Sequence, residues 1–122
     1  MTDYLTVAEV LAIHADQIDR YGGAHGLRDP GALEAAIFRP QSGYYQDIIE
    51  EAAALCESLA MNHPFIDGNK RIGFAAAYTF PAINGMRITA APEPAARFIL
   101  GALEAGAFDS QAIARWLRDN TG

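Results

Sequence analysis

Residues 63–71 decide the interpretation of this chain, and they read HPFIDGNKR. One imidazole, one carboxylate, one amide and two cations fall within this stretch, at His63, Asp67, Asn69, Lys70 and Arg71. Gly68 permits a tight turn, and a segment with helical character follows it directly. A base, a carboxylate and two cations beside the start of a helix suit chemistry on a phosphorylated nucleotide, because the first amides of a helix attract anions.

Each of these side chains has a chemical interpretation. His63 can take a proton from an attacking hydroxyl, since imidazole changes its charge near neutral pH. Asp67 can ligate Mg²⁺ beside bound phosphates. Asn69 can donate to a phosphate oxygen or hold the loop in place, and Gly68 lets backbone amides face an anion. The arginine can bind phosphate in a bidentate manner, whereas the lysine acts as a point charge.

The same stretch also has a purely structural interpretation. Residues 67–69 can form a simple turn that caps a helix, and the two following cations can lie on a solvated helix face. Cations at a helix N-terminus oppose the helix dipole, however, and an anionic ligand would relieve that opposition. The residues therefore favour a phosphate-binding site over a plain turn.

Helix signals dominate the rest of the chain. Thr6 and Glu9 form a capping-box pattern, and Asp29 precedes a proline at the first position of a helix. Together with Asp47 as a third cap, the signals predict six helices, over about residues 7–21, 30–38, 48–62, 69–83, 93–104 and 110–120. Strand signals are scarce, so we expect at most a small β-hairpin, before the third helix or around Ile88.

The fourth helix is predicted to be the central one. Its run of alanines at 75–77 permits close packing against neighbours. Pro81 lies inside it and is expected to remove one backbone hydrogen bond and kink the helix, unless the helix ends earlier.

Composition and charge restrict the class of protein. The chain has 122 residues, of which 51% are hydrophobic, so we expect one domain over residues 1–122 with a real core. A net charge of −6 argues against direct nucleic-acid binding, which would require a basic face. The single cysteine, Cys56, excludes a disulfide framework and is expected to be buried and inert. We find neither a signal-peptide pattern nor an apolar run long enough for a bilayer, and we expect a cytoplasmic protein without membrane contacts.

Residues 63–71 resemble the signature of the Fic/Doc family, and specifically of its Doc (death-on-curing) branch, the toxins of type II toxin–antitoxin systems. Further landmarks of the Doc type lie at residues 20–23, 26–31, 39–41 and 84–85. The resemblance covers most of the chain. It implies an all-α fold, a compact bundle of about six helices with the motif loop between two central helices.

The resemblance also implies an activity. Doc-type proteins are expected to transfer the γ-phosphate of ATP, or of another nucleoside triphosphate, to a hydroxyl of elongation factor Tu, which arrests translation. His63 would be the general base and Asp67 would ligate Mg²⁺. The phosphate-binding residues would be Gly68, Asn69, Lys70 and Arg71. Fic proteins that adenylylate their targets carry glycine at position 70 and arginine at position 74, where this chain has Lys70 and Phe74.

Two alternatives stay open at this point. The chain resembles Fic-type AMP transferases closely enough that adenylylation of a protein hydroxyl is the runner-up. A catalytically weak module that mainly binds its antitoxin is the non-enzymatic alternative, because some Doc-like sequences carry a basic residue where this chain has Met61 and Asn62. Pro81 could mark an attenuating change or a harmless kink.

An antitoxin is the partner that the resemblance implies. Such partners insert a helical segment into a groove of the toxin, and Tyr44, Tyr45 or the first helix could line that groove. His14 is expected to be a packed residue of the core or groove. His25 is expected in a surface turn, and Trp116 is expected to anchor the last helix.

Overall fold

The computed structural model describes residues 1–121, apart from the side chain of Pro92, and Gly122 of the expected domain lies outside that range. Its helices are α1 (Val7–Tyr21), α2 (Pro30–Phe38), η1 (Arg39–Ser42), α3 (Ile48–Met61), α4 (Asn69–Ile83), α5 (Pro92–Glu104) and α6 (Ser110–Asp119). Within the described chain, β pairing is limited to two isolated bridges, Leu27 with Phe65 and Ile88 with Thr121. The prediction of an all-α bundle of about six helices is confirmed.

Local capping chemistry explains where the helices begin. Thr6 and Glu9 form the predicted capping box, since the Thr6 side chain accepts from the Glu9 amide and Glu9 accepts from the Thr6 amide at 2.9 Å. Asp29, Asp47 and Asp109 each accept the backbone N–H three residues further on, at distances of 2.8 to 3.1 Å. These caps are properties of short segments, so the sequence alone predicted the helix starts well.

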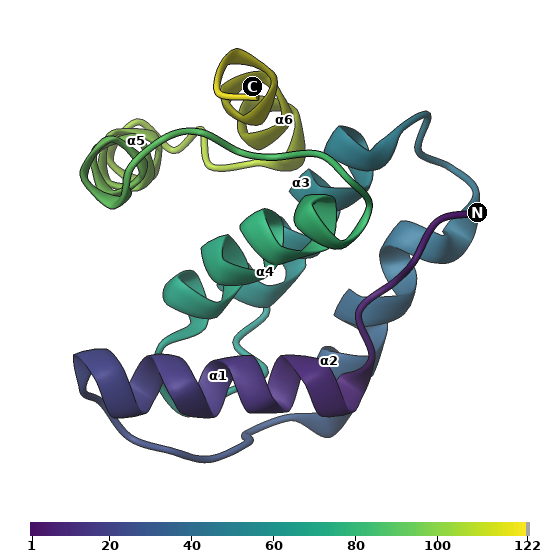
Figure 1. Cartoon of the computed structure of the whole chain (residues 1–122). Coiled ribbons are helices and arrows are strands. Elements are labelled where there is room, and N and C mark those ends of the chain that lie inside the picture. Colours follow the sequence, from purple (N-terminus) through teal and green to yellow (C-terminus); the bar gives the residue numbers. More distant parts are fainter. Residues whose placement is uncertain (122) are drawn as a thin grey trace.

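The helix α3 is the most enclosed element of the bundle. Figure 1 shows α4 lying between α1 on one side and α5 and α6 on the other, with α3 behind it. Because α3 packs against α2, η1, α4 and α6, it is buried on nearly all sides, and it shares the centre of the bundle with α4, the helix that the sequence singled out. Gly73 of α4 lies so close to α3 that a Cβ there would stand 2.9 Å from the Cys56 carbonyl oxygen.

The helix α4 runs through Pro81 to Ile83, so the alternative of an earlier end is wrong. Pro81 is fully buried and lies in the last turn of the helix. Its carbonyl accepts the backbone N–H groups of Asn84 at 3.0 Å and Met86 at 2.9 Å. The carbonyl of Pro81 thus makes the bonds that close the helix, whereas the N–H that proline lacks would have bonded to the carbonyl of Ala77.

An aromatic cluster joins the last three helices. Phe74 of α4 lies 6.0 to 6.2 Å, centroid to centroid, from Phe98, Phe108 and Trp116. Trp116 stacks on Phe98 at 5.2 Å, which confirms its predicted role as the anchor of α6. The cluster fixes α5 and α6 against the same helix that begins at the candidate site.

Cys56 is fully buried in α3, as predicted, and burial raises the pKa of its thiol. The helices described between residues 1 and 121 are each too short or too polar to cross a lipid bilayer.

Candidate active site

The loop between α3 and α4 lines a cavity of about 380 Å³. All six residues that the sequence singled out lie around it, together with Ile66: His63, Asp67, Gly68, Asn69, Lys70 and Arg71. The fold therefore brings a base, a carboxylate and two cations to one opening. The start of α4 also faces this loop, and Gly68, which precedes it, has no side chain with which to cap the first amides of the helix.

His63 follows the C-cap of α3 and has an uncommon backbone conformation. Its φ is +51°, and among the described residues it is the non-glycine residue with a positive φ. Glycine usually occupies such a position after a helix, because it has no Cβ to crowd the following carbonyl. The imidazole is exposed to solvent and lines the cavity.

Asn69 closes the loop upon itself. Its side-chain amide donates to the Phe65 carbonyl at 3.0 Å, and its side-chain oxygen accepts the Phe65 N–H at 2.9 Å. The residue is 92% buried by solvent exposure. The sequence left two roles open for Asn69, donation to a phosphate oxygen and holding of the loop. These bonds correspond to the second role.

Asp67 is held by backbone amides on both carboxylate oxygens. Oδ2 accepts the Ala24 N–H at 3.0 Å, and Oδ1 accepts the Gly68 N–H at 2.8 Å. These two bonds hold the pKa of the Asp67 carboxyl below its usual value, so the exposed group is ionised at neutral pH. Gly23 makes the approach possible, because a Cβ there would stand 2.7 Å from Oδ2.

An ionised, exposed carboxylate with unused lone pairs fits a Mg²⁺ ligand. Within residues 1–121, no group of three or more His, Cys, Asp or Glu side chains gathers into a metal cluster. Mg²⁺ is commonly held by one or two carboxylates together with water and substrate phosphates, so Asp67 fits a metal that arrives with a nucleotide.

His14 reaches the site from α1. Its ring is buried and stacks on Phe65 with centroids 3.7 Å apart and planes 7° from parallel. Nε2 lies 2.7 Å from the Asp67 carbonyl oxygen. A carbonyl can only accept, so Nε2 carries the proton in this bond. His14 is packed as predicted, but its bond to the loop was missed, because the partners are 53 positions apart in the sequence.

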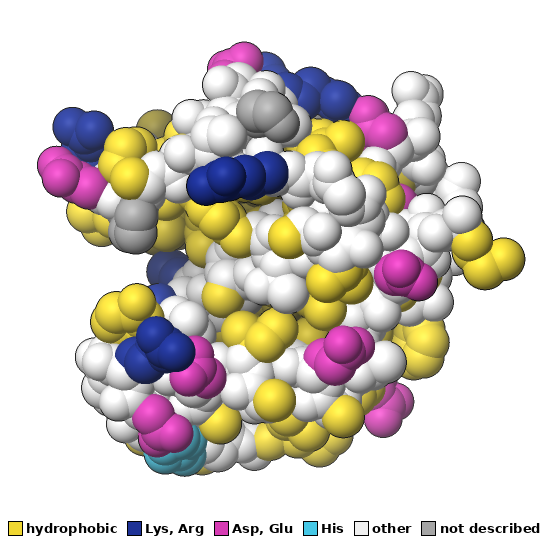
Figure 2. All heavy atoms as spheres, viewed as in Figure 1, with side chains coloured by type: hydrophobic (Ala, Val, Ile, Leu, Met, Phe, Trp, Pro, Cys, Tyr) yellow, Lys and Arg dark blue, Asp and Glu magenta, His cyan; other side chains and the backbone are white. Residues whose placement is uncertain are grey.

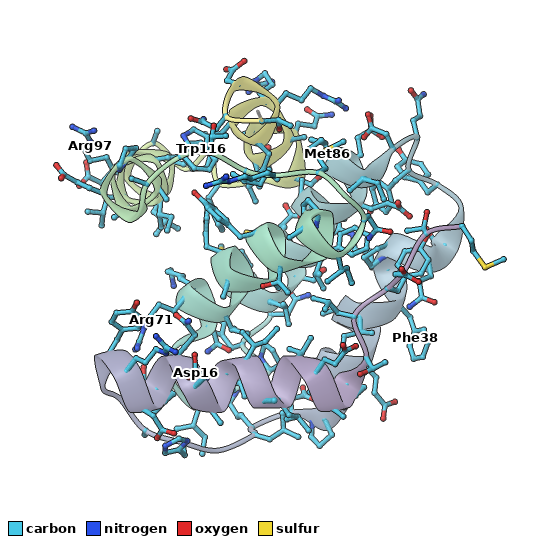
Figure 3. All side chains as sticks on the ribbon, in the orientation of Figure 1. Asp16, Phe38, Arg71, Met86, Arg97 and Trp116 are labelled. Carbon is cyan, nitrogen blue, oxygen red and sulfur yellow. The ribbon has the colours of Figure 1, made fainter. Side chains whose placement is uncertain are left out.

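The two cations lie at the first turn of α4. Arg71 donates from Nη1 to the carbonyls of Gln17 at 3.1 Å and Gly22 at 2.9 Å, which ties α4 to the end of α1. Figure 3 shows Arg71 between these two helices. The bonds described for this guanidinium use one of its nitrogens, and the others keep donors for an anion. Lys70 is half-buried at the boundary between this cavity and a neighbouring groove.

Arg28 contacts the site from the segment before α2. Its Nε donates to the His63 carbonyl at 2.6 Å, and its Nη2 donates to the Asn62 carbonyl at 3.1 Å. In the sequence this residue was only part of a family landmark, and nothing in its neighbourhood along the chain indicated a contact with His63. His25 is an exposed residue near the end of α1, as predicted, and lies 2.8 Å from Asp19.

A groove of about 870 Å³ adjoins the cavity, between α1, α4 and α5. Figure 2 shows this side of the molecule hollowed between α5 and α1. Its walls are mostly apolar and include Ala12, Ile13, Ala96 and Ile99. The groove is therefore suited to an elongated apolar ligand rather than to a phosphate.

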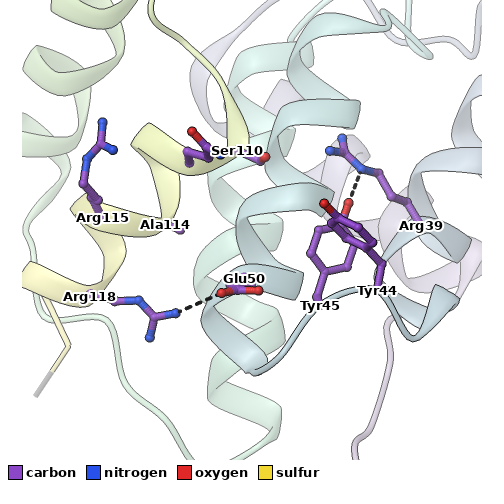
Figure 4. A pocket seen from close by; sticks show the side chains of 9 residues that line it. Arg39, Tyr44, Tyr45, Glu50, Ser110, Ala114, Arg115 and Arg118 are labelled. Carbon is purple, nitrogen blue, oxygen red and sulfur yellow. Dashed lines mark hydrogen bonds and ion pairs between the residues drawn. The ribbon is translucent and has the colours of Figure 1, made fainter.

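A second cavity, of about 480 Å³, lies near the start of α3, away from the loop (Figure 4). Two of its arginines are engaged in structural contacts. Arg39 donates to the Tyr45 hydroxyl at 2.7 Å, and Arg118 pairs with Asp47 at 2.8 Å. Tyr44 and Tyr45 line this cavity, not the groove of α1, so the two antitoxin surfaces considered from the sequence are separate places.

Comparison with known proteins agrees with the geometry. Residues 4–81 match the model of the Fic/DOC family. The toxin Doc of Mycolicibacterium smegmatis is 45% identical over 95 residues, which cover 74% of this chain and 71% of that protein. The protein kinase doc of Escherichia phage P1 is 36% identical over 94 residues, which cover 74% of this chain and 75% of that protein.

An all-α bundle with a candidate phosphate-binding loop between two packed helices, matched over these residues, defines the class: the chain belongs to the Fic/DOC family. Both relatives are Doc proteins and span most of the chain. Within the family the chain is therefore a toxin of the Doc type, as the sequence motif indicated.

Proposed function

We propose that this chain is a protein kinase that transfers the γ-phosphate of ATP to a hydroxyl of elongation factor Tu, which arrests translation until an antitoxin neutralises the enzyme. The observation that supports this proposal most strongly is the single cavity lined by His63, Asp67, Lys70 and Arg71 at the uncapped start of α4. Phosphoryl transfer depends mainly on positioning and on stabilisation of charge, and these are the groups that such a cavity supplies.

In the proposed reaction, the target hydroxyl oxygen forms a bond to the γ-phosphorus and its proton passes to the imidazole of His63. The bond from the γ-phosphorus to the bridging oxygen breaks, and ADP leaves with that electron pair. Lys70, Arg71 and the first amides of α4 bind the phosphate oxygens. Asp67 would hold Mg²⁺, which supplies positive charge against the phosphates when bound.

The surroundings of Phe74 support phosphoryl transfer over adenylylation. Adenylylating Fic proteins resemble this chain but carry an arginine at that position. Here Phe74 is 93% buried and packs against the aromatic rings of α5 and α6, so no cation extends from it toward the phosphates. A nucleotide without that second clamp is free to bind with its γ-phosphate toward His63.

The groove between α1, α4 and α5 is the surface that we propose for the antitoxin. Its apolar walls suit one face of a helix, and it borders Lys70 and Arg71 of the site. An occupant of this groove would therefore lie next to the phosphate-binding cations. That arrangement is suited to inhibition, because a bound segment would limit access of the nucleotide.

Labelled ATP tests the activity. Purified protein is incubated with Mg²⁺, elongation factor Tu and ATP that carries the label either in the γ- or in the α-phosphate. We expect label from γ-labelled ATP alone, and none with the His63→Ala variant. Transfer of the α-label would show adenylylation, and transfer of neither label would reject elongation factor Tu as the target.

A further inference from the structure

The end of α3 is held by a segment far away in the sequence. The Arg28 guanidinium donates to the carbonyls of His63 at 2.6 Å and Asn62 at 3.1 Å. The backbone amides of Arg28 and Asp29 both donate to the Pro64 carbonyl, at 2.8 and 2.9 Å. The carbonyls of residues 62–64 thus all bond to Arg28 or Asp29, two adjacent residues just before α2.

We propose that Arg28 is a positioning residue for His63, which keeps the imidazole directed into the cavity. The inference rests on the proposed function, in which His63 is the general base. His63 adopts a left-handed conformation that a side chain disfavours, so this conformation needs support from its surroundings. The bonds from Arg28 go to the carbonyls of Asn62 and His63, which belong to the two peptide groups that flank the Cα of His63.

Arginine suits this position for a geometric reason. Its planar guanidinium presents several N–H donors in a fixed fork, whereas a lysine ammonium is a single point charge on a flexible stem. Positive charge is also favourable at the C-terminus of α3, where the last helical carbonyls lack partners. Arg28 itself is exposed, so its replacement does not open a cavity in the core.

The other half of the loop is anchored by different contacts. The Asp67 carbonyl is bonded to His14, and Arg71 is bonded to the end of α1. Asn69 closes the turn on Phe65. Because none of these bonds involves Arg28, loss of its guanidinium should disturb the base and leave the phosphate-binding groups in place.

The first test is steady-state kinetics of the full chain with ATP, Mg²⁺ and elongation factor Tu. For Arg28→Ala we expect kcat to fall about 10- to 100-fold, because small misplacements of a reacting group have effects of this size. The KM for ATP should stay within about twofold of the wild type. For Arg28→Lys we expect a kcat between those of the wild type and Arg28→Ala. Arg97→Ala makes the same change at an exposed site on α5 and should have the kcat of the wild type.

An unchanged kcat in Arg28→Ala would overturn the inference, and so would a raised KM for ATP with an intact kcat. If Arg28→Ala does not fold, the kcat and the KM for ATP of Arg28→Lys are compared with those of the wild type instead.

A second readout separates this inference from the proposed function. If the wild type transfers no phosphate, the proposed function fails, but the conformation of His63 can still be measured by NMR without nucleotide. We expect the HN–Hα coupling of His63 and the carbonyl shifts of Asn62 and His63 to change in Arg28→Ala and not in Arg97→Ala. Unchanged values in both variants would show that Arg28 does not hold His63.

Discussion

At the scale of single residues, the imidazole of His63 serves the proposed reaction, but a side chain at this position makes the fold less stable. A residue with φ near +51° would be less strained as glycine, but glycine has no imidazole. We expect His63→Gly and His63→Ala both to abolish transfer, and we expect the glycine variant to be more stable than the alanine variant by about 1 kcal/mol. Urea unfolding measures this difference, and equal stabilities would contradict the strain that we assign to His63.

The ionisation of Asp67 makes the stability of the fold depend on pH. Hydrogen bonds from Ala24 and Gly68 lower its pKa in the folded state below the unfolded value of about 4. A group with a lowered folded pKa stabilises the fold above the unfolded pKa, and this contribution is lost as the pH falls through the folded pKa. We therefore expect Asp67→Asn to be less stable than the wild type at pH 7.

Acid removes this difference, because the wild-type carboxylate is then protonated as well. Unfolding curves of both proteins at pH 7 and near pH 2 are the measurement. A gap between wild type and Asp67→Asn that stays constant across this range would exclude the ionised Asp67 as its source.

His14 holds the half of the loop for which we propose phosphate binding. His14→Phe keeps a ring to stack on Phe65 but removes the donor to the Asp67 carbonyl. We expect a KM for ATP raised about tenfold or less, with a smaller change in kcat, because the lost bond lies on the side of Asp67 and not of His63. A variant that lowers only kcat would contradict the division of the loop into two separately anchored halves.

At the scale of elements, the approach of α3 to α4 depends on a glycine. A Cβ at Gly73 would lie 2.9 Å from the Cys56 carbonyl and 3.3 Å from the Ala60 Cβ, so the helices would have to move apart. We expect Gly73→Ala to destabilise the fold by about 1–3 kcal/mol. Since the residue precedes Phe74 and lies near the start of α4, some loss of activity should accompany it.

Gly101 of α5 provides the matched control. Nothing lies within 4 Å of a Cβ built there, so alanine should fit without strain. The same substitution is expected to stabilise the protein by about 0.5–1 kcal/mol, because alanine favours a helix more than glycine does. Thermal unfolding of both variants tests the pair. If both substitutions shift Tm in the same direction, the packing described for Gly73 is contradicted.

The sequence could predict the elements because their signals are local. The aspartates at positions 29, 47 and 109 each cap a helix through a backbone amide three residues away. The contacts of Arg28 and His14 with the loop depend instead on how distant segments pack, so no local pattern indicated them. The burial of α3 escaped prediction for the same reason, since periodicity shows which side of a helix is apolar but not how many neighbours cover it.

At the scale of the whole molecule, the cavity and the groove share the start of α4. An antitoxin helix in the groove and a nucleotide in the cavity would both lie against Lys70 and Arg71. We expect Ala96→Arg, which places a long charged side chain on the groove wall, to weaken binding of the cognate antitoxin at least tenfold. Titration calorimetry measures this, and phosphate transfer by the free variant should be unchanged.

Undiminished antitoxin binding by Ala96→Arg would place the partner elsewhere, for example at the second cavity beside Tyr44. The matching variant there is Tyr44→Ala, which removes an exposed ring without touching the groove. Loss of binding in that variant alone would reverse our assignment of the two surfaces.

The intact mass of elongation factor Tu tests the central claim most directly. The target is incubated with the wild-type chain, ATP and Mg²⁺, beside a sample with His63→Ala. Our account predicts a gain of about 80 Da with the wild type and none with the variant, since one phosphoryl group is added to a hydroxyl. A gain of about 329 Da would instead show transfer of AMP and would contradict our interpretation of Lys70 and Phe74.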